Sequence, residues 1–303
     1  MPAPAPPPQP LVAPPPQPLV ARTEAPAELS NPGLVLLYGD TPNGWKITYA
    51  LNSLKEAGAI PDYTVVPVFL QTDEQFDDWF IKINPNSRMP ALIDNRADKP
   101  PIHIWESAAI LLYLVRTYDT AFNYHFEDDD LHQEMLNFMF FIQAGLGPMQ
   151  GQANHFYRYA PVTIDYAVDR YQNETKRLYG VYEDHLSGKH DGKQKEFLVG
   201  DKLSYADFCT QPWLRPHFWA GLSLDPFPHL KAYMDRVEAV PSIANALKVP
   251  DVDLVTKIKN NPDLERQIME RMKKAREAKE EKARKEAVEG AAKEGGKAEQ
   301  RGP

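Results

Sequence analysis

Apolar positions in the first part of the chain follow two different periods. An uninterrupted apolar run at 34–38 (LVLLY) is typical of a buried strand, and the β-branched run at 63–68 indicates another. Between them, from about 44 to 57, apolar residues recur every three to four positions and predict a helix. The same reasoning predicts a helix over 74–83, strands over 91–94 and 102–105, and a helix capped by Ser107. The order β-α-β-α-β-β-α indicates a small α/β domain with a mixed sheet.

Strand signals stop after about residue 127, and helical periodicity takes over. The pattern predicts helices over roughly 129–156, 163–187, 204–220 and 228–239. We therefore expect two domains, an α/β domain over 33–122 and an all-α domain over 128–250.

One short motif in the second domain indicates folding rather than catalysis. Ser204 and Asp207 have the spacing of a capping box, and Leu203 with Phe208 has that of a hydrophobic staple. Asp207 is therefore expected to cap a helix, and Cys209 on the same helix to be a small core residue.

Both ends of the chain differ in composition from the part between them. Residues 1–32 are rich in proline, and PPPQPLVA occurs twice. This composition is typical of a disordered tail, or alternatively of a ligand for a proline-binding domain. Residues 251–303 are rich in charged helix formers, with a short apolar stripe of Leu264, Ile268 and Met272, and predict a solvated, partly formed helix.

Charge and cysteine content exclude several function classes. The net charge of −8 and pI of about 5.5 argue against a nucleic-acid or anionic-membrane partner, although the mixed charges of the tail leave nucleic acid as a minor option there. With a single cysteine the chain cannot form an intramolecular disulfide. The sequence contains no Cys/His cluster that would predict a metal site. With no apolar run near the ~20 residues of a membrane helix and no secretory signal, we expect a cytoplasmic protein.

Three polar motifs fall at the ends of the predicted elements of the first domain. TPNG begins at Thr41, NPNSRMPAL places Pro90 directly before a strand, and Glu106-Ser107 opens a helix. The helix start at Ser107 offers backbone N–H groups to a carboxylate, and Glu106 suits an ammonium group. If the bond before Pro90 is cis, Met89 presents its N–H and C=O to an extended peptide. Each motif alone is common in structural settings, but together they predict a site for a small zwitterion with an extended backbone.

These motifs and the element order resemble the cytosolic glutathione transferases, which join a thioredoxin-like domain to an all-α domain. The similarity runs over about 33–250. TPNGWK, NPNSRMPAL, WESAAILLYL, GLGPMQGQANHFYRYAP, YQNETKRLYGV and FLVGDKLSYADF resemble more narrowly the group of fungal nitrogen-regulator/prion-type proteins and bacterial nu-class enzymes. The resemblance implies glutathione as a substrate and a homodimer as the assembly.

The resemblance also implies which residues contact glutathione. By position they are Thr41, Asn43, Gln75, Arg88, Met89, Glu106 and Ser107. Gln75 is placed only by its distance from NPNSR, and the alternative for it is a polar residue on a helix surface.

The Thr41-Pro42-Asn43 seam contains no cysteine, whereas thioredoxin-fold oxidoreductases have a Cys-Pro-x-Cys type motif there. We therefore expect the glutathione thiol to be the nucleophile. Catalysis is assigned to Asn43, Thr41 and the helix-start amides, which would stabilise the thiolate. The alternative is an ordinary helix entry, with threonine as cap and proline in the first turn.

The run GLGPMQGQANHFYRYAP joins three glycines to a cluster of aromatic and cationic residues. In the resembled family this region lies near the subunit interface and the open side of the glutathione site. His155, Tyr157 and Arg158 are thus candidates for acceptor binding or for contact with glutathione across subunits, and dimer packing is the alternative.

The sequence therefore predicts a glutathione-dependent enzyme acting on a disulfide, a peroxide or an electrophilic metabolite. Three alternatives stay open: a biosynthetic enzyme that conjugates glutathione to a reactive metabolite, a non-catalytic regulator of the nitrogen-regulator type, and a translation-factor subunit with a transferase-like domain. The first tail is Pro-rich rather than Asn/Gln-rich, which disfavours a prion-like regulator.

Overall fold

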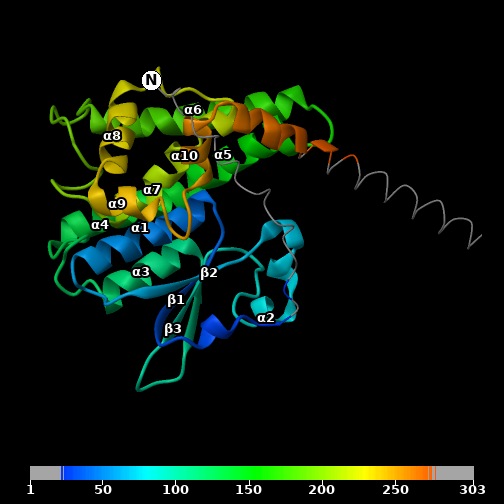
Figure 1. Cartoon of the computed structure of the whole chain (residues 1–303). Helices are drawn as coiled ribbons and strands as arrows, with labels where there is room; N and C mark the ends of the chain where they lie inside the picture. The colour runs from blue at the N-terminus through cyan, green and yellow to red at the C-terminus, as the bar shows by residue number, and fades with distance from the viewer. Residues whose placement is uncertain (1–21, 23, 272, 275–276, 278–303) are drawn as a thin grey trace, which may run out of the picture.

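The computed structural model describes residue 22 and residues 24–271, 273–274 and 277 of the 303-residue chain. Two parts are evident in Figure 1, a sheet with its helices and a stack of helices above it. Most of the predicted Pro-rich tail and residues 278–303 lie outside the described residues, as does Met272 of the apolar stripe.

The first part is a four-stranded sheet flanked by helices on both faces. Its strands are β1 (Gly33–Tyr38), β2 (Tyr63–Pro67), β3 (Ala91–Asn95) and β4 (Ile102–Trp105). Its helices are α1 (Pro42–Glu56), α2 (Asp78–Ile81) and α3 (Ser107–Thr117), with short 3₁₀ turns η1 (Ala27–Ser30), η2 (Leu70–Thr72) and η3 (Glu74–Phe76). The spatial order is β2-β1-β3-β4, with β1 parallel to β2 and the other pairs antiparallel, so the predicted mixed sheet is confirmed.

Strand β1 has an unbroken apolar run because it is buried on both faces of the sheet. Successive side chains of a strand point to opposite faces of the sheet, and here both faces are covered. Leu34 and Leu36 pack toward α1 and α3, while Val35 and Leu37 pack with Trp79 of α2 on the other face.

The second part is helical and follows the predicted pattern with finer breaks. It consists of α4 (Asp129–Phe141), η4 (Ile142–Leu146), α5 (Gly147–Asn154), η5 (His155–Tyr159), α6 (Asp165–Leu186), α7 (Tyr205–Leu214), η6 (His217–Ala220), α8 (Pro228–Glu238), α9 (Pro241–Ala246) and α10 (Leu254–Asn260). The stretches η4 and η5 are π-helical and run on from α4 and α5. The capping box of Ser204 and Asp207 at the start of α7 is confirmed, and Cys209 is buried.

Two predictions about local structure in the first part were wrong. The helix expected over 74–83 is divided into η3 and α2, because Asp77 between them has an extended conformation with φ of −70° and ψ of 147°. Ser107 is the first residue of α3 and not its cap. The N-cap position belongs to Glu106, whose φ of 67° lies in a region that side-chain-bearing residues rarely adopt.

The packed structure extends beyond both ends of the predicted globular part. At the front, Arg22 forms an ion pair with the buried Glu74, and Asn95 Nδ2 donates to the Leu29 carbonyl at 2.9 Å. At the back, α10 buries Val255 and Ile258, so the segment after residue 250 is not simply solvated.

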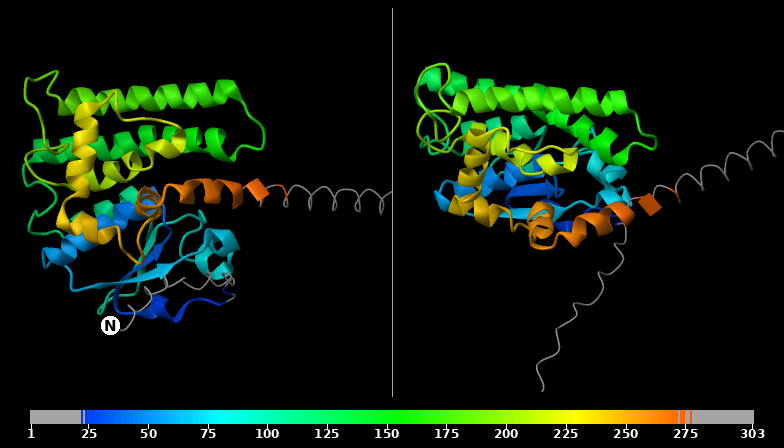
Figure 2. Two further views of the ribbon diagram at one scale, coloured as in Figure 1. Left: turned by 45° about the horizontal axis from the view of Figure 1, so that its top comes forward. Right: turned by 90° about the horizontal axis from the view of Figure 1, so that it is seen from above.

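The C-terminal helical stretch crosses the boundary between the two parts. In Figure 2 it is the orange segment between the sheet and the helical stack. The Leu254 N–H donates to Asp40 Oδ2 at 3.0 Å in the first part, and Glu265 pairs with Arg158 at 2.6 Å in the second. The helical stack is also tied directly to α1, where Tyr49 donates to Gln211 at 2.8 Å.

No helix in the described part of the chain is both long enough and apolar enough to cross a membrane.

Candidate functional site

Five of the seven predicted glutathione-contacting residues lie around one polar cavity. It has a volume of about 300 Å³ and is lined by Asn43, Asn84, Asn86, Arg88, Met89, Pro90, Glu106 and Ser107. The Met89–Pro90 peptide bond is cis. Thr41 and Gln75 are not among the lining residues.

The start of α1 forms one wall of this cavity. Thr41 is the N-cap, and its hydroxyl oxygen accepts from the Gly44 N–H at 3.2 Å while its O–H donates to the Gly39 carbonyl at 3.3 Å. The expected catalytic role of the Thr41 hydroxyl is therefore not supported, because both of its hydrogen-bonding functions serve the helix entry. Pro42 has no N–H, so the remaining donors at this seam belong to Asn43.

Asn43 is held in one orientation by a residue that the sequence analysis did not identify. The indole N–H of Trp213, on α7, donates to Asn43 Oδ1 at 3.0 Å. Because an indole nitrogen only donates, the amide oxygen must face Trp213 and the amide N–H₂ must face the other way. Asn43 lines the cavity, so its side chain is fixed there as a hydrogen-bond donor.

Trp213 packs against two glycines of the GLGPMQG run. A Cβ atom at Gly147 would lie 3.4 Å from the Trp213 ring, and one at Gly151 would lie 3.6 Å from it, both ordinary van der Waals contacts. The indole that orients Asn43 therefore lies directly against α5 of the same chain. The predicted alternatives for the run were dimer packing and an acceptor pocket, and neither involves this contact.

The start of α3 forms the opposite wall. Ser107 is buried, and its backbone N–H belongs to the first turn of an eleven-residue helix, where amide groups lack partners within the helix. Glu106, in its unusual backbone conformation, is exposed and accepts from Asn86 Nδ2 at 3.3 Å. Such conformations cluster at functional sites. The wall therefore offers donors for a carboxylate beside an acceptor for an ammonium group.

Arg88 and Met89 complete the cavity on the side of β3. Arg88 is exposed, and its carbonyl accepts from Asn84 Nδ2 at 2.6 Å. The Met89 thioether lies against Gly39, where a Cβ atom would be only 3.0 Å from Met89 Cε. A side chain at Gly39 would therefore push the end of Met89 aside, and Met89 lies against the first strand–helix seam.

Gln75 lies on η3, buried and away from the cavity lining. Its side chain is 4% exposed, and among the described residues its Oε1 has no hydrogen-bond partner. The alternative interpretation, a polar residue on a helix surface, is wrong for this buried side chain.

The three candidates from the HFYRY segment are not part of the cavity lining. His155 and Tyr157 are exposed on η5. Arg158 donates to the carbonyls of Trp219 and Phe218 and pairs with Glu265. Its guanidinium thus joins η5, η6 and the C-terminal helix of the same chain, and is engaged there rather than turned to a ligand.

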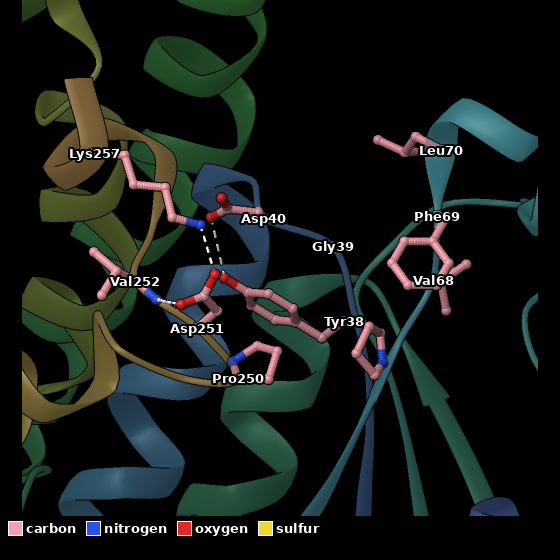
Figure 3. Close-up of a pocket in the computed structure, with 11 residues that line it drawn as sticks. Tyr38, Gly39, Asp40, Val68, Phe69, Leu70, Pro250, Asp251, Val252 and Lys257 are labelled. Atoms are coloured by element: carbon pink, nitrogen blue, oxygen red, sulfur yellow. Dashed lines mark hydrogen bonds and ion pairs between the residues drawn. The ribbon is translucent and has the colours of Figure 1, made fainter. Parts of the chain in front are cut away.

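A second, less polar cavity of about 270 Å³ lies at the same seam, where Tyr38, Gly39 and Asp40 line it (Figure 3). Phe69 and Leu70 lie on one side of it, and the Asp251–Lys257 ion pair on the other. Asp40 lies between them, accepting from the Trp45 indole at 2.7 Å. Burial raises the pKa of the Asp40 carboxyl above its usual range, and the Trp45 hydrogen bond opposes this shift.

Comparison with known proteins agrees with this geometry. The glutathione S-transferase N-terminal domain matches residues 35–116, and the glutathione S-transferase C-terminal domain matches residues 141–241. The disulfide-bond oxidoreductase YfcG of Escherichia coli is 35% identical over 214 residues, covering 70% of this chain and 93% of that protein. The transcriptional regulator URE2 of Saccharomyces cerevisiae is 31% identical over 237 residues, covering 68% and 65% respectively.

Solved structures give the same result. A glutathione transferase homolog from Lodderomyces elongisporus, solved with two glutathione molecules per subunit, is 33% identical with a TM-score of 0.65, covering 72% of this chain and 99% of that one. The transferase URE2P6 from Phanerochaete chrysosporium, in complex with oxidized glutathione, is 32% identical with a TM-score of 0.64, covering 72% and 96%. The chain therefore belongs to the glutathione S-transferase family, and within it is similar to the Ure2-type and YfcG-type proteins.

Proposed function

We propose that this protein is a glutathione-dependent thiol–disulfide oxidoreductase in which the reactive sulfur belongs to the bound glutathione. The observation that carries the proposal is the Asn43 amide, held by Trp213 so that its N–H₂ faces a cavity whose walls suit an amino-acid group. The chain's single cysteine, Cys209, is buried on α7, so the protein supplies no thiol to this cavity.

The chemistry assigned to Asn43 is stabilisation of the glutathione thiolate. A neutral amide donates at any pH, and the positive end of the α1 dipole adds to its effect. A thiolate with a lowered pKa is the attacking species in disulfide exchange. Asn43 therefore raises the fraction of bound glutathione that is ready to react.

The reaction is balanced by two glutathione molecules. The first thiolate attacks one sulfur of the acceptor disulfide, forms a mixed disulfide and expels the other sulfur as a thiolate, which takes up a proton. A second glutathione thiolate then attacks the glutathione sulfur of the mixed disulfide and releases the second acceptor thiol. The products are oxidised glutathione and two thiols. Relatives solved with two glutathione molecules, or with oxidized glutathione, support this assignment.

A second candidate, conjugation of glutathione to an apolar electrophile, is favoured by the cavity beside Phe69 and Leu70. The glutathione S-transferase-like protein gedE of Aspergillus terreus is 34% identical over 199 residues, covering 62% of this chain and 86% of that protein. In this reaction the thiolate bonds to the electrophilic carbon, and a leaving group or a proton uptake completes the balance.

The test uses the full chain on glutathione resin, followed by assays with hydroxyethyl disulfide, a hydroperoxide and chlorodinitrobenzene. We expect retention on the resin and highest turnover with the disulfide. Asn43→Ala should lower turnover about tenfold or more, because one hydrogen bond to a developing charge is lost. Asn52→Ala, a change of the same kind on α1 at a residue bonded to Tyr63, is the control. Retention without turnover would favour a regulatory protein, and no retention would overturn the proposal.

We further propose a homodimer in a reducing, cytoplasmic setting. Phe140 on α4 is 58% exposed and Trp105 on the edge strand β4 is 39% exposed, which supports burial against a second copy. Sedimentation of the full chain tests the dimer, and a monomer at micromolar concentration would contradict it. Binding of the Pro-rich segment by a proline-recognition domain remains a separate proposal, to be tested by pulldown with residues 1–32.

A further inference from the structure

A lysine lies completely buried behind the α3 wall of the glutathione cavity. Lys46 is on α1, and its side chain has no exposed surface. Its ammonium group donates to Gln143 Oε1 on η4 and to Ser107 Oγ at 3.4 Å. Lysine is almost never fully buried unless it is paired, so this position calls for an explanation.

No carboxylate of the described residues forms an ion pair with Lys46. The groups that contact it are a neutral amide, a hydroxyl and the Cys209 thiol from α7, and the Glu106 carboxylate at the start of α3 acts on it through its charge. Burial lowers the pKa of the Lys46 ammonium, and the nearby Cys209 and Glu106 oppose that effect. A buried ammonium without a counter-charge is costly, and an anion bound close by would relieve that cost.

Ser107 connects this ammonium to the cavity. Its oxygen accepts from Lys46 Nζ and also from Gln143 Nε2 at 3.3 Å. A hydroxyl oxygen has two lone pairs, so both acceptor positions are occupied and the O–H is left to donate elsewhere. Among the described residues no acceptor for this O–H is shown. Since Ser107 lines the cavity, its O–H is available to a ligand there.

We propose that Lys46 is the buried counter-charge for the amino-acid carboxylate of the ligand, acting through Ser107 as a positioning residue. The ligand class is a γ-glutamyl peptide whose carboxylate sits at the start of α3, so the inference rests on the proposed glutathione function. Lys46 orients the Ser107 hydroxyl as a donor and supplies a positive charge that solvent does not screen.

The test measures binding of two thiol-blocked ligands to the full chain by calorimetry. S-hexylglutathione carries the carboxylate in question, and the same compound with 4-aminobutanoyl in place of γ-glutamyl keeps the amine and lacks only that carboxylate. Lys46→Met removes the charge at similar length, while Lys46→Gln removes the charge but keeps an N–H donor. Lys55→Met, a half-exposed lysine on the same helix, is the matched control.

We expect both Lys46 variants to weaken S-hexylglutathione binding about tenfold or more, and binding of the 4-aminobutanoyl analogue by about twofold or less. Lys55→Met should change neither. The ligand-free Lys46→Met protein should melt at the same temperature as the wild type or higher, because an unpaired buried charge is gone. A purely structural role for Lys46 would lower the melting temperature and weaken both ligands alike.

Three results would overturn the inference. If the Lys46 variants bind both ligands more weakly by the same factor, Lys46 has a structural role. If Lys46→Gln binds S-hexylglutathione with wild-type affinity, the effect comes from hydrogen bonding alone. If neither variant changes the affinity, Lys46 takes no part in binding. Failure of the wild type to bind S-hexylglutathione is a different outcome, since it would overturn the proposed function itself.

Discussion

The protein buries two cations at the junction of its domains, and their surroundings are opposite. Arg215 on α7 is 1% exposed and pairs with Asp253 at 2.8 Å and Glu238 at 2.9 Å, with a further hydrogen bond to Thr256. Lys46 on α1 is equally buried, and among the described residues its hydrogen-bond partners are Gln143, Ser107 and the Cys209 thiol. Both lie next to Trp45, since Arg215 stacks on its ring at 5.1 Å and Lys46 follows it in the chain.

The difference separates a structural charge from a functional one. The Arg215 guanidinium has two carboxylate partners, so its charge is balanced within the fold. It links α10 to α7 and α1. The charge of an ammonium with only neutral partners is not balanced within the fold. An anion bound in the cavity beyond Ser107 would balance it. Burial alone therefore does not distinguish the two roles; the identity of the partners does.

The largest expected effect comes from breaking the paired cation. Arg215→Met leaves the buried Asp253 without its partner and should lower the free energy of unfolding by about 3–5 kcal/mol, measured with urea at neutral pH. Arg177→Met, at an exposed pair with Glu174, should lower the free energy of unfolding far less. If Arg215→Met lowers the free energy of unfolding no more than Arg177→Met does, the ion-pair network around α10 does not stabilise the fold.

A smaller effect is expected at the unpaired cation. Ser107→Ala removes the hydroxyl between Lys46 and the cavity, so the Kd for S-hexylglutathione should rise about tenfold. The free energy of unfolding should also fall, by about 1–3 kcal/mol, because the buried Lys46 ammonium and the Gln143 amide each lose an acceptor. Ser187→Ala, at the end of α6, serves as the control. A lower free energy of unfolding with an unchanged Kd for S-hexylglutathione would assign Ser107 to folding and not to ligand binding.

Periodicity and short motifs were enough to predict the fold. The apolar run of β1, the amphipathic stripe of α1 and the Ser204–Asp207 box are each local in sequence, and local patterns specify helices, strands and caps. The missed details depended on context. Asp77 interrupts the helix expected over 74–83 through its own backbone conformation, and the N-cap of α10, Asp253, pairs with Arg215, 38 residues away in the chain.

The lining of the cavity was predictable where motif residues form it, and the residues that hold this lining in place were not. Asn43, Met89 and Ser107 stand in recognisable strings at element ends. Trp213 lies in none of the quoted motifs, and Lys46, although it ends TPNGWK, was given no role, because the contacts of both arise from packing between domains.

The ion pair between Arg215 and Glu238 should also make the free energy of unfolding depend on pH. Burial acts to raise the pKa of Glu238, but the hydrogen bond and charge of Arg215 outweigh it, so this pKa lies below its usual 4.5. A carboxyl with a lowered pKa contributes stability above about pH 4.5, and this contribution is lost as the pH falls through the lowered value. The stability gap between the wild type and Arg215→Met should therefore narrow below pH 4.5, and a gap that widens on acidification would contradict the pairing.

The smallest effect is expected at Trp213, which supports Asn43 rather than the ligand. Trp213→Phe keeps a ring against Gly147 and Gly151 but removes the indole N–H. With the Asn43 amide free to turn, the pKa of the bound glutathione thiol should rise by about half a unit and turnover fall about threefold, the size of one modest hydrogen bond. The thiolate absorbance in the ultraviolet reports that pKa. Trp219→Phe, whose indole bonds to Tyr159, is the control.

The double variant decides whether Trp213 acts through Asn43. If it does, Trp213→Phe should add nothing once Asn43 is alanine, because the amide it orients is already gone. Losses that multiply in the double variant would mean that Trp213 affects the thiolate by a separate route, for instance through the packing of α5. In that case the donor orientation of Asn43 would need another cause.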